Sequence, residues 1–497
     1  MLRRLPLLIA IGAGVLVTAG AVAAGVGPLT LVSGPSPFAG CTIGGPGTNF
    51  PNAEVEPFIA VDPTNTNHMI GVVQQDRWDN GGAHGLVADV TGDGGTTWST
   101  TWAHFSLCSG GNATNGGVFE RASDPWVTFA PNGDAYQSAL TLDVDANGND
   151  SATGVQVSKL AHGSSMWSDP VTLASDPITS PTSVSHDKES ITADPTDSSD
   201  VYVVWDRSRK PGENTSPNAG HSFGFRGDAM FSRTTDGGAT WSAAQSILPT
   251  NANVFTEGNI VRVLPDGTLV DVFEAAHGSG RQGSTNPFTQ SVMRSTDKGS
   301  TWSRVIDIST DQSVGVADPD TGAPVRTGAG LPSAAVGPDG TLYVAWADSR
   351  FSGGARDDIA LSKSTDGGLS WSTPVKVNQT PVPVAAFGPA VDVSANGTVA
   401  VTYYDFRNNT ADPSTLPTDD WIVYSTDGGA TWGDEQRLTP ASFDMDSAPV
   451  APASRGHFVG DYQGLTHVGN TFDALFVQAN NGNTANPTDL FFTQATP

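Results

Sequence analysis

Carboxylate side chains recur in this sequence directly before short apolar runs that are expected to be β-strands. Asp187, Glu189 and Glu257 stand at such positions, and Tyr462 holds a similar place late in the chain. Carboxyl groups crowded into a concave site have shifted pKa values and can act as acid and base. Two of them flanking a glycosidic bond are what glycoside hydrolysis requires. We therefore expect these four side chains to be the catalytic residues of a glycosidase.

A second set of side chains is suited to holding a sugar. The candidates for substrate binding are Glu56, Arg77, Trp78, Arg121, Asp124, Arg281, Arg356 and Asp461. A guanidinium group can donate two parallel hydrogen bonds, which suits a carboxylate or a pair of hydroxyl groups. The sequence thus predicts a glycan or glycoconjugate as the partner.

The same residues have a structural interpretation. An Asp precedes an Arg by one or two positions in several units: Asp76-Arg77, Asp206-Arg207, Asp348-Ser349-Arg350 and Asp405-Phe406-Arg407. Such recurrence favours salt bridges between neighbouring units, and the carboxylates before the strands could equally be strand caps. The alternative function is therefore a non-catalytic module that binds glycan or protein.

One acidic stretch resembles the first half of a calcium-binding loop. Asp143, Asp145 and Asn147 place oxygen ligands at alternate positions, and Gly148 follows at the sixth. The twelfth position, where such a loop has a bidentate Glu, is Gly154. An Asx-rich turn is the alternative. The motifs require no cofactor, and Ca²⁺ is the one candidate metal.

A nine-residue pattern repeats along the chain and organises the elements that position these residues. Its clear copies end at a Trp and read VTGDGGTTW (90–98), RTTDGGATW (233–241), RSTDKGSTW (294–302), KSTDGGLSW (363–371) and YSTDGGATW (424–432). The Asp can accept hydrogen bonds from turn amides, and the Gly tolerates positive φ. Repetition at a long period indicates a repeat architecture. Each copy is predicted to be a hairpin turn, with the Trp opening the next strand.

Alternating apolar and polar residues before each copy predict four antiparallel strands per unit. Asp-Gly or Asn-Gly pairs such as Asp266-Gly267 and Asn396-Gly397 are strong signals for the first hairpin of a unit. Residues 460–493 form a last unit that stops before its fourth strand. The segment around 38–43 is predicted to supply that strand and close the ring, which removes exposed edges.

The expected fold class is therefore all-β, a seven-bladed β-propeller of four-stranded antiparallel blades. Six blades with the tail as an extra layer is the alternative. The expected domain organisation is a signal peptide over 1–24, an N-terminal segment over 25–54 that closes the last blade, and a propeller over 55–497. First-hairpin turns and Trp-ended turns should share one face, which leaves ligand-binding residues on the other.

The repeated pattern, S/T-x-D-x-G-x-T/S-W, resembles the Asp box of the BNR repeats in sialidase-like propellers. The resemblance covers nearly the whole chain after the first residues. It implies a propeller fold and an activity of the exo-alpha-sialidase type. The first arginine of that family lies in a Phe/Tyr-Arg-Ile-Pro motif, whereas the corresponding stretch here reads Val55-Glu56-Pro57-Phe58.

Composition and the first residues predict an exported protein. Arg3 and Arg4 precede an apolar run that ends in small residues near Ala23, as in a cleaved signal peptide, with an uncleaved anchor as the alternative. The two cysteines, Cys41 and Cys108, are then expected to form a disulfide. The formal net charge of −27 makes nucleic acid and anionic membrane poor partners. We expect a secreted monomer.

Overall fold

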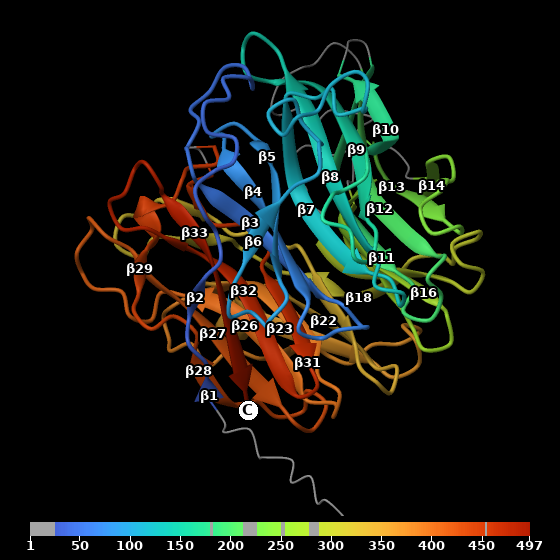
Figure 1. Ribbon diagram of the computed structural model, residues 1–497. Coiled ribbons are helices and arrows are strands. Elements are labelled where there is room, and N and C mark those ends of the chain that lie inside the picture. The colour runs from blue at the N-terminus through green and yellow to red at the C-terminus, as the bar shows by residue number, and fades with distance from the viewer. Residues whose placement is uncertain (1–24, 179–181, 212–225, 250–253, 278–287, 453–454) are drawn as a thin grey trace, which may run out of the picture.

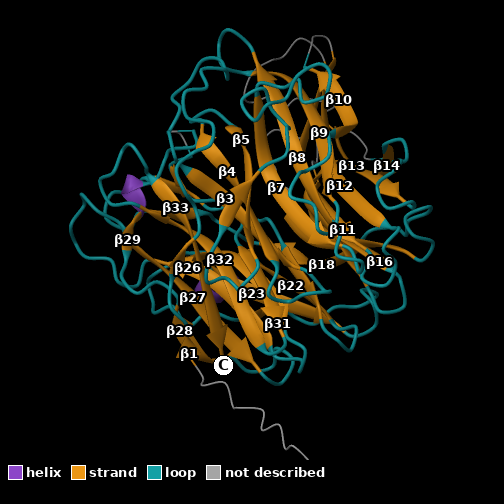
Figure 2. Ribbon diagram, in the orientation of Figure 1, coloured by secondary structure: helices purple, strands orange, loops and turns teal. Residues whose placement is uncertain are grey.

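The computed structural model describes the chain except for residues 1–24, 179–181, 212–225, 250–253, 278–287 and 453–454. The described residues form an all-β protein in which antiparallel sheets are arranged side by side (Figures 1 and 2). Helical structure in the described residues is limited to 3-10 turns such as Arg350–Ser352 and Met445–Ser447. The prediction of an all-β fold is confirmed.

The strands come in successive groups of four. The first two groups are β3 (Glu54–Val61), β4 (Met69–Arg77), β5 (Ala83–Thr91), β6 (Ser99–Thr101), and β7 (Arg121–Phe129), β8 (Ala135–Val144), β9 (Asp150–Leu160), β10 (Val171–Pro177). The next two are β11 (Thr182–Ala193), β12 (Val201–Pro211), β13 (Arg226–Thr234), β14 (Gln245–Leu248), and β15 (Val254–Val263), β16 (Leu269–His277), β17 (Phe288–Ser295), β18 (Ile306–Asp311). Two more are β21 (Ser333–Val336), β22 (Leu342–Asp348), β23 (Asp358–Ser364), β24 (Val375–Lys376), and β25 (Ala386–Val393), β26 (Val399–Asp405), β27 (Pro417–Ser425), β28 (Gly433–Arg437).

Within each group the strands pair antiparallel in chain order. The first strand of each group contacts the first strand of the next, so β3, β7, β11, β15, β21 and β25 lie side by side in that order. β25 contacts β31 (Gly464–Val468), and β31 in turn contacts β3. These first strands therefore surround one axis, and the residues that begin them meet around it.

The last sheet joins the two ends of the described chain. β31, β32 (Thr471–Ala479) and β33 (Thr488–Thr496) form an antiparallel meander, and β1 (Gly25–Val26) and β2 (Thr30–Leu31) both pair with β33 (Figure 1). The strands that pair here are thus β1 and β2, whereas the prediction had placed this strand around 38–43. In that segment Cys41 N–H bonds Phe38 O in a turn. Two-residue strands carry too little alternation to be recognised from sequence.

A small sheet lies outside the regular groups. Residues between β18 and β21 form β19 (Val316–Ala317) and β20 (Pro324–Arg326), and β20 pairs in parallel with β30 (His457–Phe458). The short β29 (Phe443–Asp444) pairs with β27. This insertion brings Arg326 and Phe458, which are far apart in the sequence, to the same place.

The repeated Trp-ended turns, which we call the Asp turns, share one hydrogen-bond pattern. In the turn at 294–302, Asp297 accepts bonds from Thr301 N–H (2.8 Å), Thr301 Oγ1 (2.7 Å) and Ser295 Oγ (2.8 Å). These bonds hold the pKa of Asp297 at about 2, because they favour the ionised carboxylate. Each Asp therefore closes its own turn.

The Asp turns also connect neighbouring groups. Tyr136 Oη of β8 donates to Gly237 O in the turn after β13 (2.9 Å), and Lys363 Nζ of β23 donates to Gly428 O in the turn after β27 (2.6 Å). Gly237 N–H bonds Ser199 O in the β11–β12 turn, so both kinds of turn share one face, as predicted. Large apolar side chains such as Trp205 and Trp346 fill the space between sheets and are fully buried.

The predicted disulfide between Cys41 and Cys108 is present, with a Cα–Cα distance of 5.7 Å. It ties the N-terminal segment to the loop that follows β6. The predicted signal peptide, residues 1–24, lies outside the described residues. Among the residues that the structure describes, no helix has the length and apolar character needed to cross a membrane.

The bonds to Asp297 predict a pH-dependent contribution to stability. A lowered folded-state pKa stabilises the fold above the unfolded pKa of about 3.9, and this contribution is lost as the pH falls toward about 2. We expect Asp297→Asn to lower the melting temperature at pH 7, with the difference from wild type shrinking between pH 4 and pH 2. Thermal melts across that range measure it. A constant difference at all pH values would contradict a role for the charge.

Removal of the disulfide should destabilise the fold. Because the bridge restricts the unfolded chain, we expect Cys41→Ser with Cys108→Ser to lower the free energy of unfolding by about 2–4 kcal/mol. Urea unfolding under oxidising conditions measures this loss. Reduction of the wild type is the control and should give the same midpoint as the variant; an unchanged midpoint in both would overturn the prediction.

Candidate functional site at one end of the central axis

A repeated β-bulge places side chains at the mouth of the central channel. The pairing of the first two strands shifts register around Glu56, Asp124, Lys188, Gly258 and Gly388. All of them have positive φ, with values of 59°, 52°, 50°, 68° and 61°. Glycine adopts this conformation at little cost, whereas a side chain with a Cβ is strained there. Three groups keep a charged residue at this strained position, and such outliers concentrate at functional sites.

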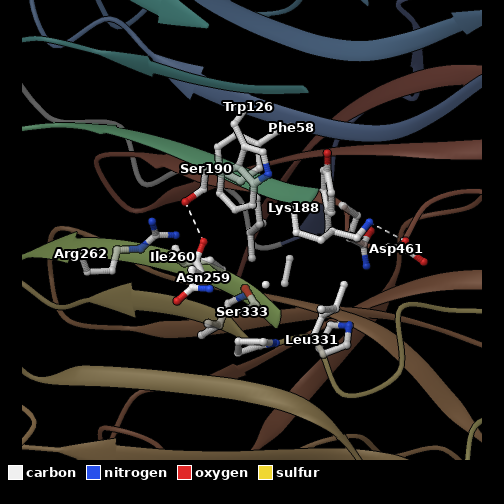
Figure 3. A pocket seen from close by; sticks show the side chains of 18 residues that line it. Phe58, Trp126, Lys188, Ser190, Asn259, Ile260, Arg262, Leu331, Ser333 and Asp461 are labelled. Atoms are coloured by element: carbon white, nitrogen blue, oxygen red, sulfur yellow. Dashed lines mark hydrogen bonds and ion pairs between the residues drawn. The ribbon is translucent and has the colours of Figure 1, made fainter. Parts of the chain in front are cut away.

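Lys188 binds the carboxylates of three other segments. Its ammonium group lies 2.7 Å from Asp461 Oδ2, 3.3 Å from Glu56 Oε1 and 3.6 Å from Asp124 Oδ2 (Figure 3 shows the contact with Asp461). Asp124 is deeply buried, which raises its pKa, but the ammonium and a hydrogen bond with Glu56 outweigh this and lower it to about 2. Burial is the main cause that raises the pKa of Glu56 well above its usual value, and the negative charge of Asp124 raises it further. One carboxylate of this pair is therefore ionised while the other keeps its proton.

Arg326 and Arg77 complete the cationic side of the cluster. Arg326 donates to Asp461 through Nε (3.0 Å) and Nη2 (2.5 Å). Both guanidinium groups stack on the buried ring of Phe458, at 4.3 Å for Arg326 and 5.2 Å for Arg77. Arg77 Nη1 donates to Gln74 Oε1 (2.8 Å). The ring therefore fixes both guanidinium planes beside the same opening.

A cavity of about 950 Å³ opens at this end of the axis. Of the predicted site residues, it is lined by Arg77, Asp124, Asp187, Glu257 and Asp461, and its other charged walls are Asp150, Lys188, Arg326 and Arg455. The structure therefore brings together carboxylates from β7, β11, β15 and the segment before β31. A space of this size with convergent charged groups can admit a sugar.

Asp187 and Glu257 differ from the paired carboxylates of the cavity. The Asp187 side chain is exposed to the cavity, and protein groups surround it on its other sides. Desolvation is the main cause that raises its pKa to about 7, and the negative charge of Asp124 is the next. Asp187 accepts a hydrogen bond from the backbone N–H of Lys188 (2.9 Å). Burial raises the pKa of Glu257, and the positive charge of Lys188 partly offsets this increase. Near neutral pH, Asp187 can therefore hold or release a proton.

Two of the predicted catalytic residues lie beneath the cavity. Tyr462 donates to Pro125 O (3.2 Å) and packs against Trp126, and burial raises the pKa of its phenol well above the usual value. Glu189 is fully buried, and both of its carboxyl oxygens lack a side-chain partner within the described chain. Burial raises its pKa as well. Burial therefore favours the protonated form of both groups, and neither side chain lines the cavity at this end.

Other predicted binding residues lie away from the cavity wall. Arg121 is fully buried, stacks on Trp78 at 4.4 Å and donates to Gly44 O (2.7 Å), which fixes the N-terminal segment. Arg356 donates to Val384 O (3.1 Å) and faces Asp358 at 3.6 Å. Arg281 lies outside the described residues.

The candidate calcium loop forms a turn closed by its own side chains. Asp145 Oδ1 accepts from Asn147 N–H (2.8 Å) and Asn149 N–H (3.0 Å). Asp143 Oδ1 accepts from Glu120 N–H (2.9 Å). Over the described ranges of the chain, no group of three or more His, Cys, Asp or Glu side chains is placed to hold a metal ion.

Sequence reasoning missed Arg326, Arg455 and Phe458. Lys188 stands among the charged residues expected at the channel mouth, but its central role was not predicted, although Glu56-Pro57-Phe58 and Asp124-Pro125-Trp126 show that a bulge recurs where Lys188 stands. Arg326, Arg455 and Phe458 come from irregular segments without a repeated pattern. Only the pairing of β20 with β30 brings Arg326 and Phe458 to the site.

No protein-family model and no curated protein sequence matches the chain. Solved structures similar to it include an alpha-L-arabinanase of Penicillium chrysogenum complexed with arabinobiose, at 11% identity, a TM-score of 0.46, and coverage of 94% of this chain and 98% of that one. An alpha-L-arabinofuranosidase from Fusarium graminearum with an iminosugar inhibitor aligns at 13% identity, a TM-score of 0.46, and coverage of 91% and 95%.

An intramolecular trans-sialidase from Ruminococcus gnavus in complex with oseltamivir carboxylate aligns at 12% identity, a TM-score of 0.44, and coverage of 76% and 95%.

Lys188 should be essential for stability at neutral pH. Lys188→Met leaves Glu56, Asp124 and Asp461 without their common cation, and we expect it to lower the free energy of unfolding by about 3–5 kcal/mol at pH 7. The lowered pKa of Asp124 stabilises the folded state at pH values above the pKa that Asp124 has in the unfolded chain. The loss of stability in the variant should therefore shrink as the pH falls from about 4 toward 2.

Urea unfolding at several pH values measures this loss. The matched control is Lys363→Met, because Lys363 Nζ donates to the carbonyl of Gly428 and forms no ion pair among the described residues. If both variants lost the same stability, the ion cluster would not be a main support of the fold.

Proposed function

We propose that the chain is a secreted glycoside hydrolase of the sialidase-like type that acts at the cavity on the central axis. The observation that carries the proposal is that Asp187 and Glu257 line one cavity, and that burial and the charge of Asp124 raise the pKa of Asp187 to about 7. Two carboxyl groups facing one site, one of which can hold a proton near neutral pH, are what glycoside hydrolysis requires.

In this proposal Asp187 is the general acid. It keeps its proton at mildly acidic pH and is open to a ligand, so it can protonate the leaving oxygen of a glycosidic bond. Glu257, from the neighbouring β15, faces the same cavity and is the partner carboxylate that activates water or forms the glycosyl intermediate. The negative charge of Asp124 raises the pKa of Asp187, so it helps Asp187 to retain its proton.

The cationic wall favours a sugar that carries a carboxylate. Arg77, Arg326 and Arg455 line the cavity, and the first two are held by the Phe458 ring. Fixed guanidinium groups bind carboxylates in preference to hydroxyl groups because the hydrogen bonds are charge-assisted. We therefore propose an acidic glycan as the substrate class, bound with its carboxylate on the arginine side.

The fold proposed for this activity is a seven-bladed β-propeller. It is supported by the circular order of contacts among the first strands β3, β7, β11, β15, β21, β25 and β31. Pairing of β1 and β2 with β33 supports residues 25–54 as the segment that completes the last blade. Export, with cleavage of residues 1–24, agrees with the Cys41–Cys108 disulfide.

A non-catalytic glycan-binding module is the second candidate. The observation that favours it is the locked state of Glu56, Asp124 and Asp461 around Lys188, because an ion cluster that joins separate sheets has a structural role by itself. In that case the cavity binds the sugar without turnover.

Asp187→Asn should separate the two functions. On a panel of fluorogenic sialosides and neutral glycosides, we expect the wild type to cleave an acidic glycoside and the variant to lose about 10²–10⁴-fold in kcat/KM. Activity should fall as the pH rises above about 7, because the acid then loses its proton. The control is Asp169→Asn, an exposed Asp outside the cavity.

Glycan binding by calorimetry completes the test. Binding without turnover of any glycoside would assign the chain to the non-catalytic class. Turnover that is unaffected by Asp187→Asn would place the chemistry elsewhere.

A further inference from the structure

The central axis has a second opening, at the face of the Asp turns. A cavity of about 680 Å³ lies there and is walled by the first strands and their hairpin turns. Its wall is mainly apolar, with Val61, Pro195, Pro265, Val336 and Val468 among the lining residues. It shares no lining residue with the sugar-binding cavity at the other end.

Arg262 is the strongly basic group of this wall. Its side chain is half-buried, and its Nε donates to Ala334 O (2.7 Å) while Nη1 donates to Val261 O (3.2 Å). Within the described part of the chain, Arg262 forms no ion pair. Burial lowers the pKa of its guanidinium group to about 10. A half-buried cation that is bonded to the protein through neutral carbonyls and lines a cavity can be stabilised by an anion bound there.

The nearest acidic group is already engaged. Asp392 Oδ2 lies 2.7 Å from His467 Nδ1, and both residues line the same cavity. The charge of Asp392 acts on Arg262, but the two side chains do not approach within ion-pair distance. The cavity therefore offers one guanidinium without its own carboxylate, set in an apolar wall.

Arg262 also extends toward a narrow space of about 60 Å³ between the two cavities. Figure 3 shows Arg262 at one end of this space and the Lys188–Asp461 pair at the other. Phe58 and Trp126, whose ring centroids are 3.9 Å apart, line the same space. The two mouths of the axis are thus separated by packed rings and by an ion pair.

We propose that this second mouth is a binding site for a small monocarboxylate with an apolar body. The carboxylate binds the Arg262 guanidinium, and the apolar part lies against the Val and Pro side chains of the wall. A guanidinium recognises a carboxylate through parallel hydrogen bonds, and an apolar wall excludes the water that would otherwise solvate it. The site is independent of the proposed hydrolase site and does not require it.

Octanoate and 1-octanol are the probes, used on the full chain in calorimetric titrations. They share the apolar body and differ in the charged group. We expect octanoate to bind the wild type about tenfold or more tightly than octanol, and Arg262→Gln to abolish this difference. Equal affinity for both probes on the wild type, or no binding of octanoate, would overturn the proposal.

Three controls keep the outcome clear. Arg304→Gln removes an exposed arginine outside the wall and should leave octanoate binding unchanged, which excludes an effect of net charge. Arg262→Lys keeps the positive charge but lacks the forked guanidinium, so it should retain part of the preference for octanoate. This variant provides the test if Arg262→Gln folds poorly. Asp187→Asn should bind octanoate as the wild type does, so a failure of the hydrolase proposal and a failure of this one remain distinguishable.

Discussion

The ammonium group of Lys188 holds together a cluster of buried carboxyl groups at the centre of this protein. Lys188 lies on β11, and the carboxylates around it come from β3, from β7 and from the segment that precedes β31. These segments belong to separate groups of strands, with β3 and β7 in one sheet and β11 and β31 in two others, so the cluster joins the parts of the chain that surround the axis. Without the cation, the three carboxyl groups would be desolvated next to each other with Arg326 paired to Asp461 alone, which is an unfavourable state. The site at this mouth therefore depends on the same interaction that holds the first strands together.

The strained backbone explains why such a cluster can exist. A first strand with regular alternation would point side chains either at the axis or between sheets. The bulge adds a residue with positive φ, and this residue points a charged group toward the opening. Gly258 and Gly388 occupy the equivalent places on β15 and β25, where no charge is needed. Among these bulges of the described chain, a residue with a Cβ has positive φ where a charged group is placed, which supports a function for these positions.

The features that sequence reasoning recovered are local. The Asp turns were predictable because the Asp, the Gly and the Trp act within one hairpin, and each copy repeats the evidence. Asp124, Asp187, Glu257 and Asp461 could be placed at the mouth because they stand at the same point of repeated units.

The features that sequence reasoning missed are set by tertiary contacts. Trp78 and Arg121 have residue types that suit a sugar, but they stack on each other under the N-terminal segment. Arg326 reaches the site only through the pairing of β20 with β30. β1 and β2 pair with β33 at the other end of the chain, as in Gly25 with Thr496 and Thr30 with Phe492. No local pattern encodes such contacts.

The two ends of the axis differ because the turns at one end serve the fold. The Asp turns and the first hairpin turns repeat their sequence and bond to each other, so they are constrained by packing. The insertion with β19 and β20 lies at the opposite end, where it disturbs none of these turns. Charged groups from several strands line the cavity at that end. In the wall of the cavity at the Asp-turn end, the arginine is Arg262, and neither its bond to Ala334 O nor that to Val261 O requires a positive charge. A neutral donor could make both bonds, so the charge itself is the feature that calls for a ligand.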